Sequence, residues 1–168
     1  MIKISKKADY AVLIMASLST RQAEHEARTQ STTIHEVEPT SAQEIADDNR
    51  LSRPLCANLL KTLTRASLLE SVRGAGGGYR LALPSFDINL MQIIEAIDGP
   101  IRLVECAGSD HDHSTCSLSD HCQSQSAMRI VHERVANLLV QIQLPELSQQ
   151  QASTGPVSGH LTTLHDAK

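Results

Sequence analysis

Aromatic side chains are nearly absent from this 168-residue chain, which has one Phe, two Tyr and no Trp. A buried core must therefore be built from Leu, Ile, Val and Ala. Long apolar runs are also missing, and a membrane-spanning helix needs about 20 consecutive apolar residues. The run at residues 11–18 is short, and no convincing signal-peptidase site follows it. We therefore expect a cytoplasmic protein that has no membrane partner.

The chain has no overall excess of positive charge, since its net charge is −4. That value alone would argue against nucleic acid as a partner. The charges are unevenly distributed, however, because residues 24–48 carry seven acids against Arg28. Residues 50–80 carry a single acid, Glu70, against six bases: Arg50, Arg53, Lys61, Arg65, Arg73 and Arg80. A local charge of +5 is the electrostatic footprint expected of a surface that binds a polyanion.

Aliphatic side chains are almost missing from residues 106–122, which read C-A-G-S-D-H-D-H-S-T-C-S-L-S-D-H-C. A hydrophobic core cannot order such a segment. Its cysteines, Cys106, Cys116 and Cys122, have the spacing C-x9-C-x5-C, with histidines and aspartates between them. In a reducing compartment, clustered thiols favour metal or redox chemistry over structural disulfides.

Three interpretations of these thiols remain open from the residues alone. They could be free, or they could bind structural zinc with a histidine as the fourth ligand. Zinc sites usually include a short C-x2–4-C pair, which is missing here. The third interpretation is an iron–sulfur cluster, for which three thiolates leave a place for a weaker fourth ligand.

The first half of the chain contains a helix-turn-helix pattern. Ser5 can cap a helix over about residues 6–20, and residues 21–40 are polar and without periodicity, so we expect a long, mobile loop there. Ser41 and Glu44 fit a capping box at the start of a short helix. Ser52 can cap the next helix, whose leucines recur at helical spacing and whose opposite face is polar and basic. Two short helices joined by a tight turn are typical of DNA-binding proteins.

A β-hairpin is predicted directly after this pattern, where alternating residues flank the glycine-rich turn at 73–78. The turn lacks the Lys-Ser/Thr of a phosphate-binding loop, and a strand rather than a helix follows it, so the pattern does not predict a nucleotide site. A hairpin in this position is a wing, and the arginine at its tip suits a DNA minor groove. The basic helix could also be an ordinary solvated face. The candidate DNA contacts are Ser41, Ser52, Arg53, Asn58, Lys61 and Arg73.

The last third of the chain predicts two further helices. Asn89 can cap a helix that ends at the D-G-P turn of residues 98–100. Over residues 124–143 the apolar positions follow a heptad seam: Met128, Val131, Val135, Leu138 and Ile142. A second copy of the chain would cover this seam and give a homodimer, although the stripe could instead pack only on the first helix. Residues after Leu147 are of low complexity and predict disorder.

The predicted fold is therefore mainly α with a small β-hairpin. Residues 1–100 are expected to form a winged helix-turn-helix domain, and residues 101–123 a cysteine-rich cluster-binding loop. A dimerisation helix would occupy residues 124–147 and a disordered tail residues 148–168. No nucleophile–base arrangement of an enzyme is recognisable.

Several of these motifs resemble the IscR/NsrR family of winged-helix iron–sulfur transcription regulators. The residues that carry the resemblance are the start I-K-I-S-K-K-A-D-Y-A-V-L, the wing V-R-G-A-G-G-G-Y-R-L-A, and I-I-E-A-I-D-G-P-I-R-L-V-E-C with three spaced cysteines. The sequence is most similar to the regulators of the Suf iron–sulfur assembly operon. The resemblance implies a homodimeric repressor of iron–sulfur assembly genes that binds double-stranded operator DNA. It also implies that Cys106, Cys116 and Cys122 hold a cluster, and that Arg73 enters the minor groove.

The resemblance also bears on the fourth cluster ligand. The IscR branch has a histidine three residues after its last cysteine, where this chain has Gln125. Asp9 matches the aspartate that the NsrR branch supplies from the other subunit, which favours a 4Fe-4S cluster over a 2Fe-2S cluster. Ser67 stands where relatives often have glycine. The alternatives to an assembly regulator are a nitric-oxide or redox sensor of the same build and, further away, a zinc-stapled interaction module.

Overall fold

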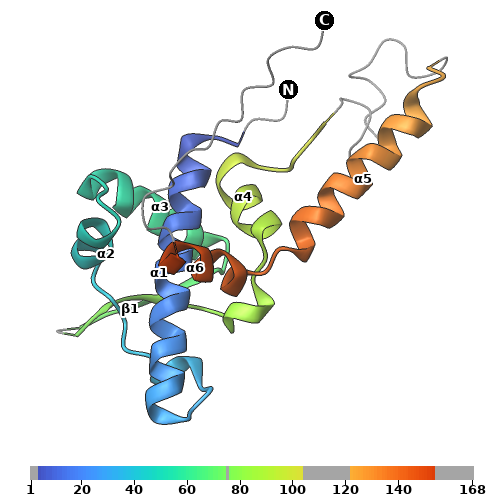
Figure 1. Ribbon diagram of the computed structural model, residues 1–168. Helices are drawn as coiled ribbons and strands as arrows, with labels where there is room; N and C mark the ends of the chain where they lie inside the picture. Colours follow the sequence, from blue (N-terminus) through green and yellow to red (C-terminus); the bar gives the residue numbers. More distant parts are fainter. Residues whose placement is uncertain (1–3, 75, 104–121, 154–168) are drawn as a thin grey trace, which may run out of the picture.

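The computed structural model describes residues 4–74, 76–103 and 122–153 (Figure 1). Cys106 and Cys116 lie outside the described residues. The fold is mainly α with one small antiparallel sheet, which confirms the predicted class. In chain order the elements are α1 Lys6–Thr29, η1 Ile34–Glu36, α2 Ala42–Asp48, α3 Arg53–Arg65, β1 Leu69–Val72, β2 Gly78–Leu81, η2 Ser85–Asp87, α4 Leu90–Asp98, α5 Gln125–Gln141 and α6 Leu144–Ser153.

Side-chain caps begin three of these helices, as the sequence predicts. The Ser5 hydroxyl accepts a hydrogen bond from the amide of Ala8 at 3.1 Å, and the Ser41 hydroxyl accepts one from the amide of Glu44 at 3.2 Å. Asn89 forms a complete capping box with Gln92. Ser52 occupies the cap position of α3, but its side chain makes no capping hydrogen bond. Local chemistry thus sets where α1, α2 and α4 begin.

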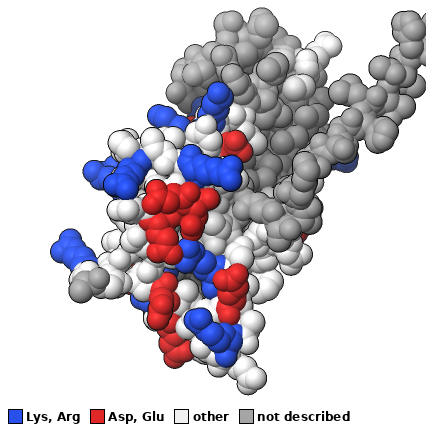
Figure 2. All heavy atoms as spheres, turned by 60° about the vertical axis from the view of Figure 1, so that its left-hand side comes forward, with Lys and Arg blue, Asp and Glu red and all other residues white. Residues whose placement is uncertain are grey.

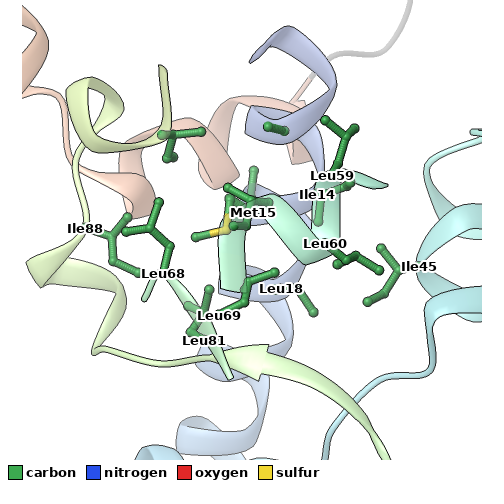
Figure 3. Close-up of a cluster of buried hydrophobic side chains, with 14 of the residues drawn as sticks. Ile14, Met15, Leu18, Ile45, Leu59, Leu60, Leu68, Leu69, Leu81 and Ile88 are labelled. Atoms are coloured by element: carbon green, nitrogen blue, oxygen red, sulfur yellow. The ribbon is translucent and has the colours of Figure 1, made fainter. Parts of the chain in front are cut away.

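An aliphatic core surrounds α1, which runs through the middle of the molecule (Figure 1). Ile14, Met15 and Leu18 of α1 meet leucines and isoleucines from α2, α3, both strands and the segment before α4 (Figure 3). The one phenylalanine, Phe86, is 70% exposed, so it adds little to the core. The absence of buried aromatics agrees with the composition.

The prediction of a long, mobile loop at residues 21–40 is wrong in its first half. Helix α1 continues to Thr29, and η1 forms a further turn at residues 34–36. Past residue 20, Gln22 is the one residue of α1 that is buried, so the extension carries no apolar stripe that a sequence pattern could reveal. Arg21 ties this part of α1 to α2, since its guanidinium lies 2.8 Å from Glu44 and 2.6 Å from Asp48. The Glu44 carboxylate is thereby used in an ion pair.

The predicted hairpin is present, with Leu69 opposite Leu81 and Val72 opposite Gly78. Thr40 joins it as a one-residue bridge, because it exchanges backbone hydrogen bonds of 2.8 and 2.9 Å with Tyr79. A Cβ atom at Gly78 would overlap the carbonyl of Thr40. Glycine is therefore required there by the close approach of the two backbones.

The helix predicted over residues 124–147 is two helices, α5 and α6, with a break after Gln141. The break is hydrogen-bonded to the start of α4, since the amide of Leu90 donates to Ile142 at 2.9 Å and that of Leu144 to Ile88 at 2.9 Å. Helix α6 then packs across α1 (Figure 1). Residues 148–153 are helical, which corrects the prediction of disorder there. Residues 154–168 lie outside the described part.

Candidate nucleic-acid interface and cysteine segment

Helix α3 separates a buried face from a polar one. Its buried residues are Cys56, Leu59, Leu60 and Leu63. On its other side Arg53, Asn58 and Lys61 are all exposed. The two predicted cap residues, Ser41 and Ser52, are exposed at the starts of α2 and α3. The fold therefore brings all five candidates from these two helices to the surface.

Acidic side chains divide the positive charge on this side of the molecule. In Figure 2 a group of acids lies at the centre of the face that α2 and α3 help to form, with basic side chains above and below it. Glu44 and Asp48 of α2 pair with Arg21 and so are partly neutralised within the protein. A polyanion would be attracted to the flanking basic regions rather than to the centre of the face.

The two arginines of the wing have different environments. Arg73 follows β1 directly and is exposed. The side chain of Arg80 on β2 is only 14% exposed, and its Nε donates to the Glu70 carboxylate at 3.1 Å. That hydrogen bond holds the pKa of Glu70 below its usual range. Only Arg73 is free to reach a ligand, although sequence reasoning counted both in the basic stretch.

Asp9 is exposed in the first turn of α1. The same turn is fastened to the end of α4, because the Asp98 carboxylate accepts hydrogen bonds from the Ser5 amide at 3.0 Å and the Ser5 hydroxyl at 2.5 Å. The chain leaves α4 at Gly99 and leads toward the cysteine segment. Asp98 therefore joins the root of that segment to the turn that carries Asp9.

Cys122 is the one cysteine of the segment within the described residues. It is half-buried just before α5, and its sulfur lies 3.9 Å from the Ser124 hydroxyl. Groups of three or more potential metal ligands are absent from the described ranges, which leave out two of the three clustered cysteines. The Cys122 thiol is a donor that fits an iron–sulfur cluster, and the described residues do not bring it into contact with Asp9. The fourth cysteine, Cys56, does not belong to this set, because burial in the core raises the pKa of its thiol.

Sequence reasoning missed three polar residues that position the site rather than form it: Arg21, Arg80 and Asp98. Asp98 lies in the quoted D-G-P motif, but the motif indicated only where a helix ends. Arg21 lies in a stretch without periodicity. Only the folded chain reveals their partners, which are 10 to 93 residues away in sequence.

A helix-turn-helix followed by a two-stranded wing and a long projecting helix defines a winged-helix transcription regulator. The chain belongs to the Rrf2 family, whose model is described as an iron-dependent transcriptional regulator and matches residues 4–150. It is thus a DNA-binding regulator of transcription and not an enzyme.

Individual relatives agree with this assignment. The chain is 26% identical over 146 residues to the HTH-type transcriptional regulator IscR of Vibrio cholerae, which covers 87% of this chain and 75% of the relative. Among solved structures, CymR, the global cysteine regulator of B. subtilis, matches with a TM-score of 0.64 and 29% identity, over 89% of this chain and 98% of that one. The IscR of T. potens matches with a TM-score of 0.60 and 26% identity, over 92% and 93% of the two chains. No helix in the described ranges is long and apolar enough to cross a membrane.

Proposed function

We propose that this chain is a homodimeric, iron–sulfur-cluster-dependent repressor of iron–sulfur assembly genes that acts in the cytoplasm. One observation carries the proposal: Cys122 stands at the foot of α5, and α5 buries none of its 17 residues within its own chain. A change at the cysteines would therefore act directly on a helix whose apolar side chains are not buried within the described part of the chain. The similarity to IscR regulators supports the same conclusion.

In this proposal α5 is the dimerisation helix. The exposed fractions of Val131 and Leu138, two residues of the heptad seam, are 46% and 57%. Apolar side chains at seam positions become buried when two such helices pack together. Each subunit would then consist of a winged domain over residues 1–100, a cluster loop over residues 101–123 and α5.

Cys106, Cys116 and Cys122 would hold the cluster through their thiolates, with Asp9 of the other subunit as the fourth ligand. When bound, the cluster would supply a labile, oxidisable iron centre. Because Asp9 matches the aspartate of the NsrR branch, the resemblance favours a 4Fe-4S over a 2Fe-2S cluster.

DNA contacts would come from the exposed residues of the two short helices and from the wing. Arg53, Asn58 and Lys61 of α3 would face a major groove, while Ser41 and Ser52 would bind phosphates at the starts of their helices. Arg73 would reach the adjacent minor groove. A dimer presents two such sets to successive turns of the duplex.

Analysis of iron, zinc and sulfide in anaerobically purified protein tests the cluster. We expect iron and sulfide in the native chain and in Cys56→Ala, because Cys56 lies in the core. Both should be lost in Cys122→Ala. Stoichiometric zinc without sulfide would contradict the proposal.

Sedimentation of Leu138→Glu tests the dimer. A charge in the seam should convert the dimer to a monomer and weaken DNA binding by more than tenfold, because one of two half-sites is lost. Glu133→Gln, an exposed position away from the seam, is the control and should remain dimeric. If cluster-loaded and cluster-free proteins bind the same promoter fragments equally well, the sensor proposal fails even if the dimer is found.

A further inference from the structure

The polar segment between α1 and α2 is attached to the base of the wing. Thr40 pairs with Tyr79 of β2 through two backbone hydrogen bonds. Three residues upstream, Val37 is 9% exposed, and its carbonyl accepts a hydrogen bond from Arg80 at 3.3 Å. Ile34 and Val37 line one small cavity together with Leu18 of α1 and Leu81 of β2. The segment therefore connects the core helix with the hairpin.

Arg80 is the residue at which these contacts converge. Its Nη1 donates to the carbonyl of His35 at 2.6 Å, its Nη2 lies 3.4 Å from the His35 ring, and its Nε donates to Glu70 at 3.1 Å. One guanidinium thus binds β1, β2 and η1 together. A planar group with five N–H donors in a fixed fork can do this, whereas a lysine ammonium on a flexible stem cannot reproduce the geometry.

Leu69 and Leu81 anchor the hairpin in the core, and further contacts at its base add support, because a two-stranded hairpin on its own is marginally stable in water. Its own pairing extends over only four residues of each strand. The direction in which its tip projects then depends on what holds its base. Thr40, the partners of Arg80 and a 3.5 Å contact between the His35 ring and the Glu70 carboxylate tie the base of the hairpin to the segment before α2.

We propose that Arg80 is a positioning residue for DNA binding: by joining the hairpin to residues 35–37 it fixes the direction in which the wing presents Arg73. The alternative is that the Arg80 guanidinium binds a DNA phosphate directly. Its low exposure and three protein partners argue against that role. The inference depends on the proposed contact between the wing and DNA.

Glu70→Gln separates the two roles by the sign of its effect. Removing an acid beside the DNA-binding surface should strengthen DNA binding if only charge matters. If Arg80 acts by position, loss of its carboxylate partner should weaken binding about two- to fivefold. The measurement is the Kd for a DNA fragment that the wild-type protein has selected from a random pool. Tighter binding by Glu70→Gln would overturn the proposal.

Two substitutions of Arg80 itself provide the second test. Arg80→Lys keeps the charge but loses the fork, so it should weaken binding about tenfold, nearly as much as Arg80→Gln. The slope of log K against log salt should stay unchanged in both variants, whereas Lys61→Gln, which removes a proposed phosphate contact, should lower its magnitude by about 0.9. Wild-type affinity of Arg80→Lys, or a slope lowered by Arg80→Gln, would show a direct contact instead.

Cleavage by a glutamate-specific protease reports the position of the segment without DNA. Glu36 and Glu38 flank the carbonyl of Val37 that Arg80 binds, so cleavage there should be several-fold faster in Arg80→Lys while the thermal midpoint changes little. Unchanged cleavage would contradict the proposed attachment. Arg73→Gln serves as the separate check of the wing contact: if its affinity equals that of the wild type, the wing does not touch DNA, whatever the protease shows. If both Arg80 variants fail to fold, the sign of the Glu70→Gln effect alone decides.

Discussion

The winged domain and α5 are built from similar aliphatic residues but use them differently. In the winged domain Ile14, Leu60 and Ile93 are fully buried. In α5 no residue is buried, and four large apolar side chains are at least 43% exposed: Ile130, Val131, Leu138 and Val140. Burial of apolar area is the main stabilising contribution to a fold. Within the described residues the winged domain therefore buries its own apolar side chains, whereas α5 does not, and the proposed dimer would cover them.

The starts of α4 and α5 show the same contrast, although α3 of the winged domain also begins without a side-chain cap. Helix α4 of the winged domain begins with a reciprocal capping box between Asn89 and Gln92. Helix α5 begins at Gln125, and Ser124 at its cap position makes no capping hydrogen bond with its side chain. Side-chain hydrogen bonds thus fix the start of α4, whereas no such bond fixes the start of α5.

Truncation of one leucine in each region should show the difference between the winged domain and α5 most clearly. Leu60→Ala is expected to lower the free energy of unfolding by about 2–5 kcal/mol, because it leaves a cavity in a fully buried site. Leu138→Ala should lower it by less than about 0.5 kcal/mol in protein dilute enough to be monomeric, since the side chain is already solvated. Urea unfolding measures both. Equal effects would mean that α5 is buried within its own chain.

Removal of the side chains at the two cap positions, Asn89 and Ser124, should show a smaller difference in stability between the two regions. Asn89→Ala is expected to cost about 1 kcal/mol, because the amide of Gln92 loses its acceptor. Ser124→Ala should change stability by only about 0.3 kcal/mol. Thermal unfolding of the cluster-free protein distinguishes them, and a large loss in Ser124→Ala would reveal a cap that forms only in the assembled protein.

The winged domain also contains a strained residue. Ser67 has a φ of 59°, in the left-handed region that disfavours residues with a Cβ atom. Ser67→Gly should therefore raise the free energy of unfolding by about 0.5–1 kcal/mol, net of the greater entropy of an unfolded glycine. Ser71→Gly in β1 is the matched control and should lower it by a similar amount. A loss of stability in both variants would argue against strain at Ser67.

Acid should weaken the winged domain slightly through Glu70. Hydrogen bonding to Arg80 lowers the pKa of Glu70 in the folded state, so its stabilising effect is present at neutral pH. The effect is lost as the pH falls from the ordinary glutamate pKa through the lowered one. Because the pair is partly exposed, about 0.5 kcal/mol is expected. A thermal midpoint that falls with pH equally in Glu70→Gln and the wild type would assign the loss to other carboxylates.

Local patterns in the sequence predicted the helix starts, the hairpin and the aliphatic core, because a cap or a glycine-rich turn acts over a few residues. The observation that relatives often have glycine at position 67 also has a structural reason, since Ser67 adopts a positive φ that glycine tolerates. The exposed positions of Arg53, Asn58 and Lys61 followed from helical spacing alone. Their contact with DNA stays a prediction.

The sequence could not predict the features that depend on contacts distant in the chain. Residues 21–29 are polar and are tied to α2 by the ion pairs of Arg21, whereas α6 is anchored in the core by Leu144; neither segment carries a long periodic stripe. Arg80 was counted as free charge because nothing nearby in the sequence indicates that it binds the carbonyls of His35 and Val37. The other two proposed cluster ligands, Cys106 and Cys116, lie outside the described residues.

The hydrogen bonds between residues 88–90 and 142–144 have a geometric consequence. They pin the start of α4 to the end of α5, and residues 99–124 connect the other ends of the two helices in sequence. Asp98 ties the end of α4 to α1, whereas no residue of α5 is buried. In the proposed regulator, a change at the cluster would therefore displace α5 rather than α4. Spin labels on the two helices would register a change in their separation when iron is removed.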